Sequence, residues 1–225
     1  MTVAILQSNY IPWKGYFDII AKSDVFVVYD EVQYTKNDWR NRNLIITPTG
    51  LNWLTIPIRV FKLDQKINET KSASSNWNKK HFNSLKLNYG KASGFNDFKD
   101  ILEDLYFDTP ENLTEINLKF IQCICNFLGI TTRIIDSRNL DLTGNRNERL
   151  VDACEKLGAS IYLSGPSAKN YLDINLFNSS KILVEWMDYT TYQEYPQLSP
   201  TFNHNVSIID LILNNGFESR KYLLY

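Results

Sequence analysis

The sequence predicts an α/β protein with a mostly parallel sheet, flanking helices, a β-hairpin and a helical insertion. Short apolar runs, typical of buried strands, alternate with segments of helical periodicity. Residues 3–30 hold two such runs joined by a loop and a helix, which makes the two strands parallel. The chain has 225 residues, of which 44% are hydrophobic, enough for a sizeable core. We therefore expect a single α/β domain over residues 1–225, with the helical insertion at about residues 70–128.

The first third of the chain supplies a strand-helix-strand unit and a hairpin. The strands are expected at Val3–Leu6 and Asp24–Asp30, both continuous apolar runs. Between them, residues 13–20 carry four aromatic or aliphatic side chains at helical spacing. The runs at residues 44–47 and 53–60 flank Pro-Thr-Gly, which predicts a β-hairpin or a sheet edge.

The middle of the chain is predicted to be helical. Residues 77–85 and 95–105 each place apolar side chains at steps of three and four. Thr109 as N-cap and Pro110 at the first helical position begin a third helix, and Gly129 ends it.

The final third returns to alternating strands and helices. A helix is expected at residues 148–157. The last helix starts at Ser207, where Asp210 completes a pattern like a capping box, and it ends at Gly216. Further strands are predicted at residues 133–136, 161–164 and 182–187.

Composition excludes several classes of protein. The net charge is −1, so there is no basic field for a nucleic-acid backbone. The N-terminus lacks the features of a signal peptide, and no apolar run is long enough to span a bilayer, so we expect a cytoplasmic protein without a membrane span. Cys123, Cys125 and Cys154 fit no zinc or redox motif and are expected to be buried thiols. No cluster has metal-ligand spacing, so no metal is predicted.

The expected site lies beyond the carboxyl ends of the parallel strands, where ligands bind in such sheets. Residues 7–15, 30–43 and 164–173 should meet there, and all three segments are rich in polar and aromatic side chains. Loops of this kind often carry function. The substrate-binding candidates are Gln7, Asn9, Tyr10, Trp13, Gln33, Arg40, Arg42, Asn43, Lys80, Ser164, Gly165, Ser167, Tyr171 and Asp173.

Arg40 and Arg42 form the candidate anion clamp. One residue separates them, so in an extended segment both point the same way and both guanidinium groups can bind a pyrophosphate or carboxylate. The alternative is a solvated surface loop. Two other candidates also have structural alternatives. Trp13 can simply pack its own turn, and Asp173 can be the N-cap of a short helix.

His81, Asp30 and His204 are the catalytic candidates. The chain has two histidines, and histidine is the natural general base near neutral pH. We expect His81 to face the three loops, with Lys80 lowering its pKa by like-charge repulsion; the alternative is a structural histidine. Asp30 ends a strand, and His204 approaches from the C-terminal side. The backbone at Ser164–Ser167 can stabilise an oxyanion, whereas no G-x-S-x-G nucleophile is present.

Six ordered segments resemble the WbqC-like family over about residues 3–217. They are QSNYIPWKGYFDII, DVFVVYDEVQYTKNDWRNRN, NWLTIPI, NWNKKHFNSLKLNYGK, YLSGPSAKNYLD and SIIDLILNNG. The resemblance implies a place in the biosynthesis of O-antigen, lipopolysaccharide or another surface polysaccharide. Some members carry the label of glycine or amino-acid transferase, which implies a transferase. The resemblance supplies no set of catalytic residues.

The leading expectation is an acyl or aminoacyl (glycyl is one candidate) transferase acting on the amine of a nucleotide-linked amino sugar. The expected donor is a thioester of coenzyme A or of an acyl carrier protein. One alternative is a nucleotidyltransferase or ATP-dependent ligase of the same pathway, against which the lack of a histidine pair on the first loop argues. The other is a non-catalytic sugar-binding or scaffold protein. The sugar, the donor and the oligomeric state stay open.

Overall fold

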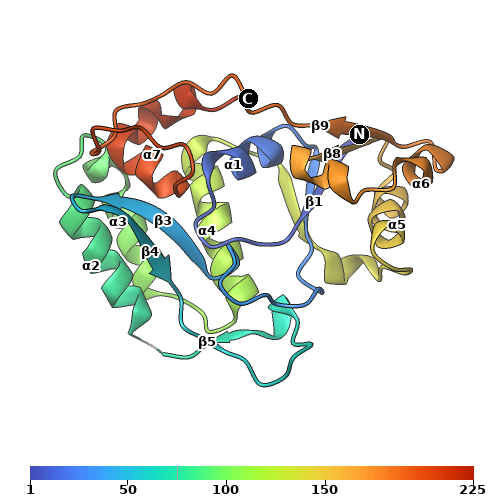
Figure 1. Cartoon of the computed structure of the whole chain (residues 1–225), viewed down its shortest axis with the longest axis horizontal. Helices are drawn as coiled ribbons and strands as arrows, with labels where there is room; N and C mark the ends of the chain where they lie inside the picture. The colour runs from blue at the N-terminus through green and yellow to red at the C-terminus, as the bar shows by residue number, and fades with distance from the viewer. Residues whose placement is uncertain (75) are drawn as a thin grey trace.

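The centre of the molecule is a parallel β-sheet, seen in a computed structural model that describes residues 1–74 and 76–225. Its strands are β1 (Thr2–Leu6), β2 (Val25–Val28), β7 (Arg133–Asp136), β8 (Ile161–Ser164) and β9 (Leu183–Trp186). Their spatial order is β7-β2-β1-β8-β9, and every neighbouring pair is parallel. The first strand of the chain therefore lies at the middle of the sheet (Figure 1).

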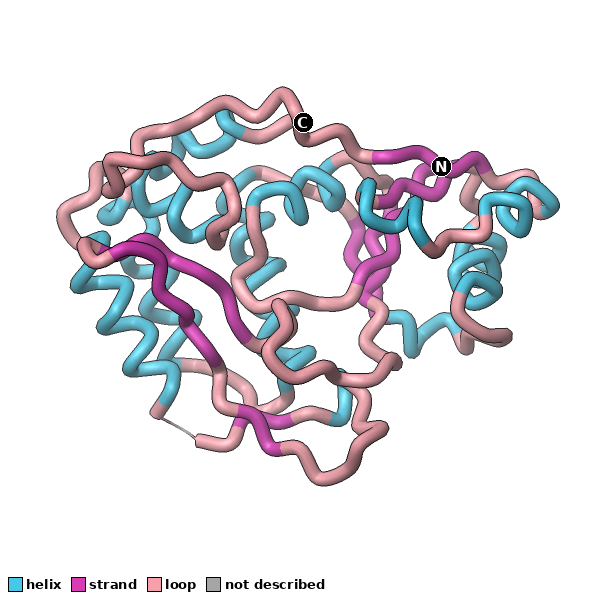
Figure 2. Tube along the Cα trace, in the orientation of Figure 1, coloured by secondary structure: helices cyan, strands magenta, loops and turns pink. Residues whose placement is uncertain are grey.

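Helices cover both faces of this sheet. They are α1 (Lys14–Ala21), α4 (Leu113–Leu128), α5 (Asn147–Leu157) and α6 (Ile174–Ser179). Ala4 and Phe26 pack toward α1 and α4, whereas Val3 and Val25 pack toward α5 and α6. Figure 2 shows α1 and α4 on one side of the strands and α5 and α6 on the other. Strands buried on both faces are continuous apolar runs, which is why the sequence predicted them well.

The segment between β2 and α4 forms a second lobe beside the sheet (Figures 1 and 2). It consists of the hairpin β3 (Arg42–Thr47) and β4 (Gly50–Thr55), the short pair β5 (Ile58–Arg59) and β6 (Lys71–Ser72), and the helices α2 (Trp77–Tyr89) and α3 (Phe95–Phe107). The C-terminal helix α7 (Ile208–Asn215) contacts α3 and β3. The α/β class, the parallel sheet and the hairpin are confirmed. Helix α4, inside the predicted insertion, is the helix that returns the chain to the sheet at β7. Short 3-10 helices complete the chain at Ile67–Glu69, Ser137–Leu140, Pro166–Asn170 and Gly216–Tyr222.

Two predicted helix starts are corrected. The third helix begins at Leu113, and its N-cap is Asn112, whose side chain accepts a hydrogen bond from the Glu115 amide at 3.3 Å. The Leu113 amide donates to the Thr70 carbonyl, so the chain is tied to the neighbouring segment there and cannot turn into a helix at Thr109. Ser207 caps α7 as predicted. Asp210 does not complete a capping box, because its carboxylate accepts from two tyrosine hydroxyls instead.

The cysteines are free thiols. Cys125 and Cys154 are buried, whereas Cys123 is half-buried, so its predicted burial is only partial. Burial raises the pKa of Cys125 and of Cys154 to about 12, which makes both of them poor nucleophiles at neutral pH. Among the described residues, no helix is both long and apolar enough to cross a membrane.

Candidate functional site

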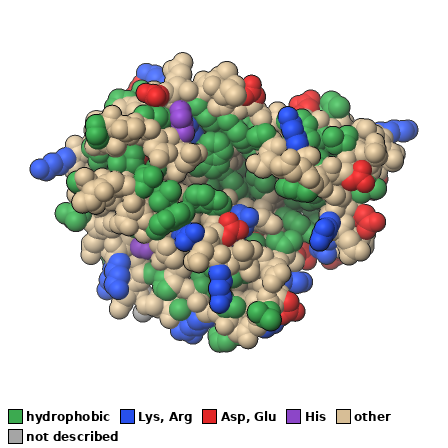
Figure 3. Space-filling model, in the orientation of Figure 1, with side chains coloured by type: hydrophobic (Ala, Val, Ile, Leu, Met, Phe, Trp, Pro, Cys, Tyr) green, Lys and Arg blue, Asp and Glu red, His purple; other side chains and the backbone are tan. Residues whose placement is uncertain are grey.

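A crevice opens where β1 and β8 end side by side. From β1 the chain leaves toward one face of the sheet, and from β8 it leaves toward the other. Ligands of doubly wound sheets bind at such a switch point. The described residues form three adjoining cavities there, of about 490, 390 and 380 Å³. We call them the Arg40 cavity, the Arg146 cavity and the outer cavity, and together the crevice; Figure 3 shows the surface hollowed in this region.

The Arg40 cavity is the place where the three predicted loops meet. It takes side chains from the loop after β1, from the segment before β3 and from the loop after β8, so the predicted convergence is confirmed. Its volume suits a small ligand. Its lining residues are Leu6, Gln7, Asn9, Trp13, Tyr16, Ile19, Trp39, Arg40, Ser164, Gly165, Pro166, Ser167, Ala168, Tyr171 and Tyr189.

Arg40 is the fixed cation of this cavity. Its guanidinium donates to the side-chain oxygens of Gln7 and Asn9, and Asp38 lies 3.7 Å away. The side chain is 17% exposed. A guanidinium has five N–H donors, so donors remain for an anion that enters the cavity.

The predicted shared direction of Arg40 and Arg42 is wrong. Arg42 begins β3, donates to the Asn37 carbonyl at 2.5 Å, and stacks 4.1 Å from the centre of the Trp53 ring. Residues 36–41 form turns rather than an extended strand, so the rule that alternate side chains share a direction does not apply. The crevice therefore holds one arginine of the predicted pair.

A buried polar knot holds the floor of the crevice. Asp30 accepts from the Ser8 amide at 2.8 Å, and from the hydroxyls of Ser8 and Thr114 at 2.6 Å each. Asn117 donates to the Ser8 hydroxyl and to the Arg40 carbonyl, both at 2.9 Å. Burial raises the pKa of Asp30, and these hydrogen bonds oppose that shift. Asp30 is 2% exposed and lines none of the three cavities, so it positions the loop after β1 rather than facing a ligand.

Aromatic rings form one wall of the crevice. Trp13 lies against Tyr189, with ring centres 4.8 Å apart, and both line the Arg40 cavity. The Trp13 ring also lies directly over Gly15, where an added Cβ would come within 2.3 Å of it. Glycine is therefore needed at this position because the ring approaches so closely. Trp13 packs its own turn, which is the alternative that the sequence left open, and it also forms part of the cavity wall.

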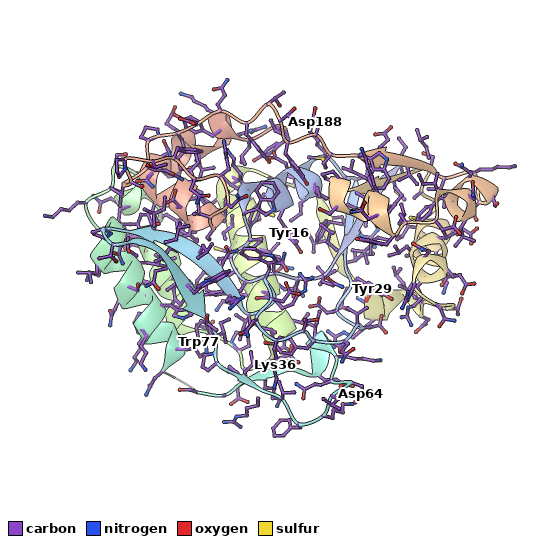
Figure 4. All side chains as sticks on the ribbon, viewed as in Figure 1. Tyr16, Tyr29, Lys36, Asp64, Trp77 and Asp188 are labelled. Carbon is purple, nitrogen blue, oxygen red and sulfur yellow. The ribbon has the colours of Figure 1, made fainter. Side chains whose placement is uncertain are left out.

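His81 does not face the crevice, contrary to the prediction. It is 7% exposed, and its Nδ1 forms a 2.9 Å hydrogen bond with the Tyr10 hydroxyl. That hydroxyl also bonds Tyr106 at 2.6 Å, and the Trp77 ring packs 5.3 Å away. Burial lowers the pKa of His81 to about 4; Lys80, the predicted cause, is exposed. Figure 4 shows Trp77, which marks this cluster, well apart from Tyr29, which lines the Arg146 cavity.

The other predicted residues divide between the crevice and the rest of the molecule. Asn43 lines the outer cavity while its amide donates to the Tyr10 and Ile11 carbonyls. His204 packs on Phe202 and Tyr192 beside that cavity, and burial lowers its pKa. Those that line the crevice are Gln7, Asn9, Trp13, Arg40, Asn43, Ser164, Gly165, Ser167 and Tyr171; those outside its lining are Tyr10, Asp30, Gln33, Arg42, Lys80, His81, Asp173 and His204.

Two of the residues outside the lining have evident structural roles. Asp173 caps α6 by accepting from the Asn175 amide at 3.1 Å, which is the alternative that the sequence left open. Gln33 donates to the Leu63 carbonyl at 2.6 Å. Neither residue therefore needs a ligand to explain its position.

Several lining residues were not among the predictions. Tyr29 ends the run that contains β2, and Arg146 and Asn147 lie where α5 begins, which is also the carboxyl side of the sheet. That topological position was the signal available in the sequence. The remaining additions are the polar or aromatic residues Tyr16, Trp39, Tyr162, Tyr189 and Asn205 and the apolar residues Ile5, Leu6, Pro12, Ile19, Leu150, Pro166 and Ala168.

The charge of the crevice is distinctive. Within the described residues, Arg40 and Arg146 are the charged side chains that line the three cavities, and no carboxylate, lysine, histidine or cysteine lines them. Such a site attracts an anion and offers it neutral amides, hydroxyls and aromatic faces. No group of three or more His, Cys, Asp or Glu suited to a metal ion occurs in the described part of the chain.

Comparisons with known proteins found a matching family model and a similar protein. Residues 7–222 match the model of the WbqC-like protein family. The uncharacterized protein Rv1507c of Mycobacterium tuberculosis is 45% identical over 225 residues, which cover 99% of this chain and 97% of that protein. No solved structure matches the chain.

Proposed function

The chain belongs to the WbqC-like protein family, and from that premise we propose that it is an enzyme that transfers an acyl or aminoacyl group to the amine of a nucleotide-linked amino sugar. The single observation that carries the proposal is Arg40, a fixed cation in a cavity whose other described lining residues are amides, hydroxyls, aromatic rings and aliphatic side chains. The pathway part, surface-polysaccharide assembly, comes from the family resemblance alone. The cytoplasmic location is an expectation from the N-terminal sequence and the lack of a long apolar run.

Each group in the Arg40 cavity has a matching part of this substrate. Arg40 would bind the pyrophosphate, because a planar guanidinium forms bidentate, charge-assisted hydrogen bonds with phosphate oxygens. The amide N–H groups of Gln7 and Asn9, whose oxygens already hold Arg40, would donate to sugar hydroxyls. The rings of Trp13 and Trp39 offer flat apolar faces for a base or a sugar.

The transfer itself exchanges one bond for another. The neutral sugar amine attacks the thioester carbonyl, the C–N bond forms, the C–S bond breaks, and the departing thiolate takes up the proton that the amine loses. Since no carboxylate or imidazole lines the cavities in the described chain, the protein contributes positioning of the two reactants. The backbone of Ser164–Ser167 would stabilise the oxyanion of the tetrahedral intermediate.

A matched pair of variants tests the binding step. Arg40→Ala should weaken binding of a dTDP-linked amino sugar by about 10- to 100-fold, as expected for loss of a charged hydrogen bond. Arg42→Ala is the control, because Arg42 stacks on Trp53 outside the crevice and its loss should leave the affinity within about twofold. Calorimetry measures both. Equal affinity of Arg40→Ala and wild type would overturn the proposed site.

Mass spectrometry after incubation with donors tests the reaction. An N-acylated sugar formed from a thioester donor supports the proposal, and pyrophosphate release with ATP supports a nucleotidyltransferase or ligase instead. Binding without any product supports a sugar-binding or scaffold protein. This sugar-binding or scaffold candidate is favoured by one observation: no carboxylate, lysine, histidine or cysteine is among the described lining residues.

A further inference from the structure

The Arg146 cavity lies on the other side of the switch point from the Arg40 cavity. The two share Leu6, Gln7, Ser164 and Tyr171, which form a common rim. Beyond this rim, the lining of the Arg146 cavity is Ile5, Tyr29, Arg146, Asn147, Leu150 and Tyr162. Each compartment therefore has its own arginine and its own aromatic side chains, and two ligands bound in them would meet above Gln7 and Ser164.

Arg146 is available to a ligand in a way that its neighbours are not. Arg149 is paired with Glu31 at 3.3 Å, and Arg138 is paired with Asp136 at 2.7 Å. Arg146 is exposed at the mouth of the cavity and forms no ion pair among the described residues. An exposed, unpaired guanidinium beside an apolar cavity is suited to a phosphate.

The walls of the cavity suit a flat ring. Tyr29 and Tyr171 both line it, and Tyr171 is 69% exposed, so much of its surface is free to contact a ligand. The Asn147 side chain donates to the Tyr171 carbonyl at 3.2 Å, which holds this loop to the start of α5. Beneath them, Tyr162 stacks on Phe177 with ring centres 4.9 Å apart, so the floor is packed. Aromatic side chains with one cation at the rim match a nucleotide base and its phosphate.

We propose that the Arg146 cavity binds the nucleotide portion of the second substrate, a nucleotide thioester of the coenzyme A type, with its base against Tyr29 and Tyr171 and its phosphate at Arg146. The inference rests on the proposed function, since it assigns the donor of that reaction. The cavity, of about 390 Å³, takes a mononucleotide-sized group. The thioester arm would extend from it over Gln7 and Ser164 to the amine held in the Arg40 cavity.

Reciprocal binding measurements test this assignment. Calorimetry with coenzyme A and, separately, with a dTDP-linked sugar is performed on wild type, Arg146→Ala and Arg40→Ala. We expect Arg146→Ala to weaken coenzyme A binding by about 10- to 100-fold and to change dTDP-sugar binding by less than about twofold, with Arg40→Ala showing the reverse pattern. Each ligand should also bind with nearly unchanged affinity when the other is saturating.

Several outcomes would overturn the assignment. They are the absence of coenzyme A binding to wild type, equal coenzyme A affinity in Arg146→Ala, or competition between the two ligands. ATP and AMP are further probes. If they bind and depend on Arg146 while coenzyme A does not bind, the compartment takes an ATP-type nucleotide and the thioester assignment is wrong. Thermal melting of each variant checks that it is folded, and Arg146→Gly provides a second variant because Arg146 has a φ of 37° that glycine adopts readily.

The same measurements separate this inference from the proposed function. If the variants show the reciprocal binding pattern but no N-acyl product forms, the nucleotide site at Arg146 is supported and the proposed transfer reaction is refuted. If the N-acyl product forms and Arg146→Ala leaves the KM of the donor unchanged, the transfer reaction is supported and the nucleotide site at Arg146 is refuted.

Discussion

The crevice and the cluster around His81 have similar composition. They differ in whether their polar side chains remain accessible to a ligand. Both combine aromatic rings with polar side chains, and both were candidates for the site. In the cluster, the Tyr10 hydroxyl bonds both His81 and Tyr106, and the rings around it exclude solvent. In the crevice, Arg40 is held by neighbours yet lines an open cavity.

The difference teaches that the partners of a polar side chain, rather than its type, decide between packing and binding. A buried polar group that has its hydrogen bonds stabilises the fold, and it has nothing left to offer a ligand. The hydrogen bonds among Ser8, Asp30 and Thr114 belong with the cluster in this respect, although they lie directly beneath the crevice. The Oδ1 of Asn117, which donates to Ser8, is buried without a hydrogen-bond partner among the described residues.

The largest expected effect is on stability, and it follows from removing Asp30, the hydrogen-bond acceptor of the buried polar knot. Asp30→Ala leaves the Ser8 amide and the hydroxyls of Ser8 and Thr114 without their acceptor, and it should cost roughly 3–5 kcal/mol of the free energy of unfolding, measured by urea denaturation. Thr114→Val, which removes a single donor and keeps the shape, should cost only about 1 kcal/mol. Unchanged stability together with abolished turnover would return Asp30 to the role of catalytic base.

The next effect is a pH dependence carried by His81. Its pKa in the folded state, about 4, lies below the ordinary value, so the fold favours neutral imidazole. The contribution of neutral His81 to the free energy of unfolding should therefore be complete above pH 6.5. It should fall by roughly 3 kcal/mol as the pH drops from 6.5 to 4. His81→Gln cannot titrate, so its stability deficit relative to wild type should shrink as the pH falls over this window. Denaturation at pH 7.5 and pH 4.5 checks this, and a constant deficit would contradict it.

The smallest expected effect separates a cap from a ligand contact at the edge of the crevice. Asp173→Ala removes the N-cap of α6 and should lower the free energy of unfolding by about 1 kcal/mol. Binding of the dTDP-linked sugar should stay unchanged, because Asp173 lines none of the three cavities. Asp173→Asn, which keeps the capping oxygen, should retain most of the stability. A fall in affinity at constant stability would place Asp173 in the site after all.

The sequence predicted the sheet and the position of the crevice because both follow from local patterns. Apolar runs identify the doubly buried strands, and the order of strands and helices identifies the edge where ligands bind. Local signals also located Gln7, which follows β1, Ser164, which ends β8, and Trp13, which lies at the start of α1.

The errors come from contacts that are remote in the sequence. Tyr10 forms hydrogen bonds with His81, 71 positions away in the sequence, and with Tyr106, 96 positions away. Helical spacing around His81 therefore cannot reveal that its ring already has a hydrogen-bond partner. Arg40 and Arg42 diverge because the chain turns before β3. Arg146 was not predicted because a 3-10 helix and a loop separate it from the end of β7, and only the folded sheet brings it next to Tyr29.

The central place of β1 has a consequence for synthesis on the ribosome. The first strand to emerge meets β2 soon, at Val25–Val28, but its other neighbour, β8, starts only at Ile161. Until then one edge of β1 has no partner, and an unpaired apolar strand edge is a hazard for aggregation of a nascent chain. The Met1 carbonyl, which accepts hydrogen bonds from the Ser160 and Ile161 amides, likewise has no partner until those residues have been synthesised. A ligand that binds at the junction of β1 and β8 stabilises only chains in which that junction exists, so substrate cannot protect this protein until β8 has been synthesised.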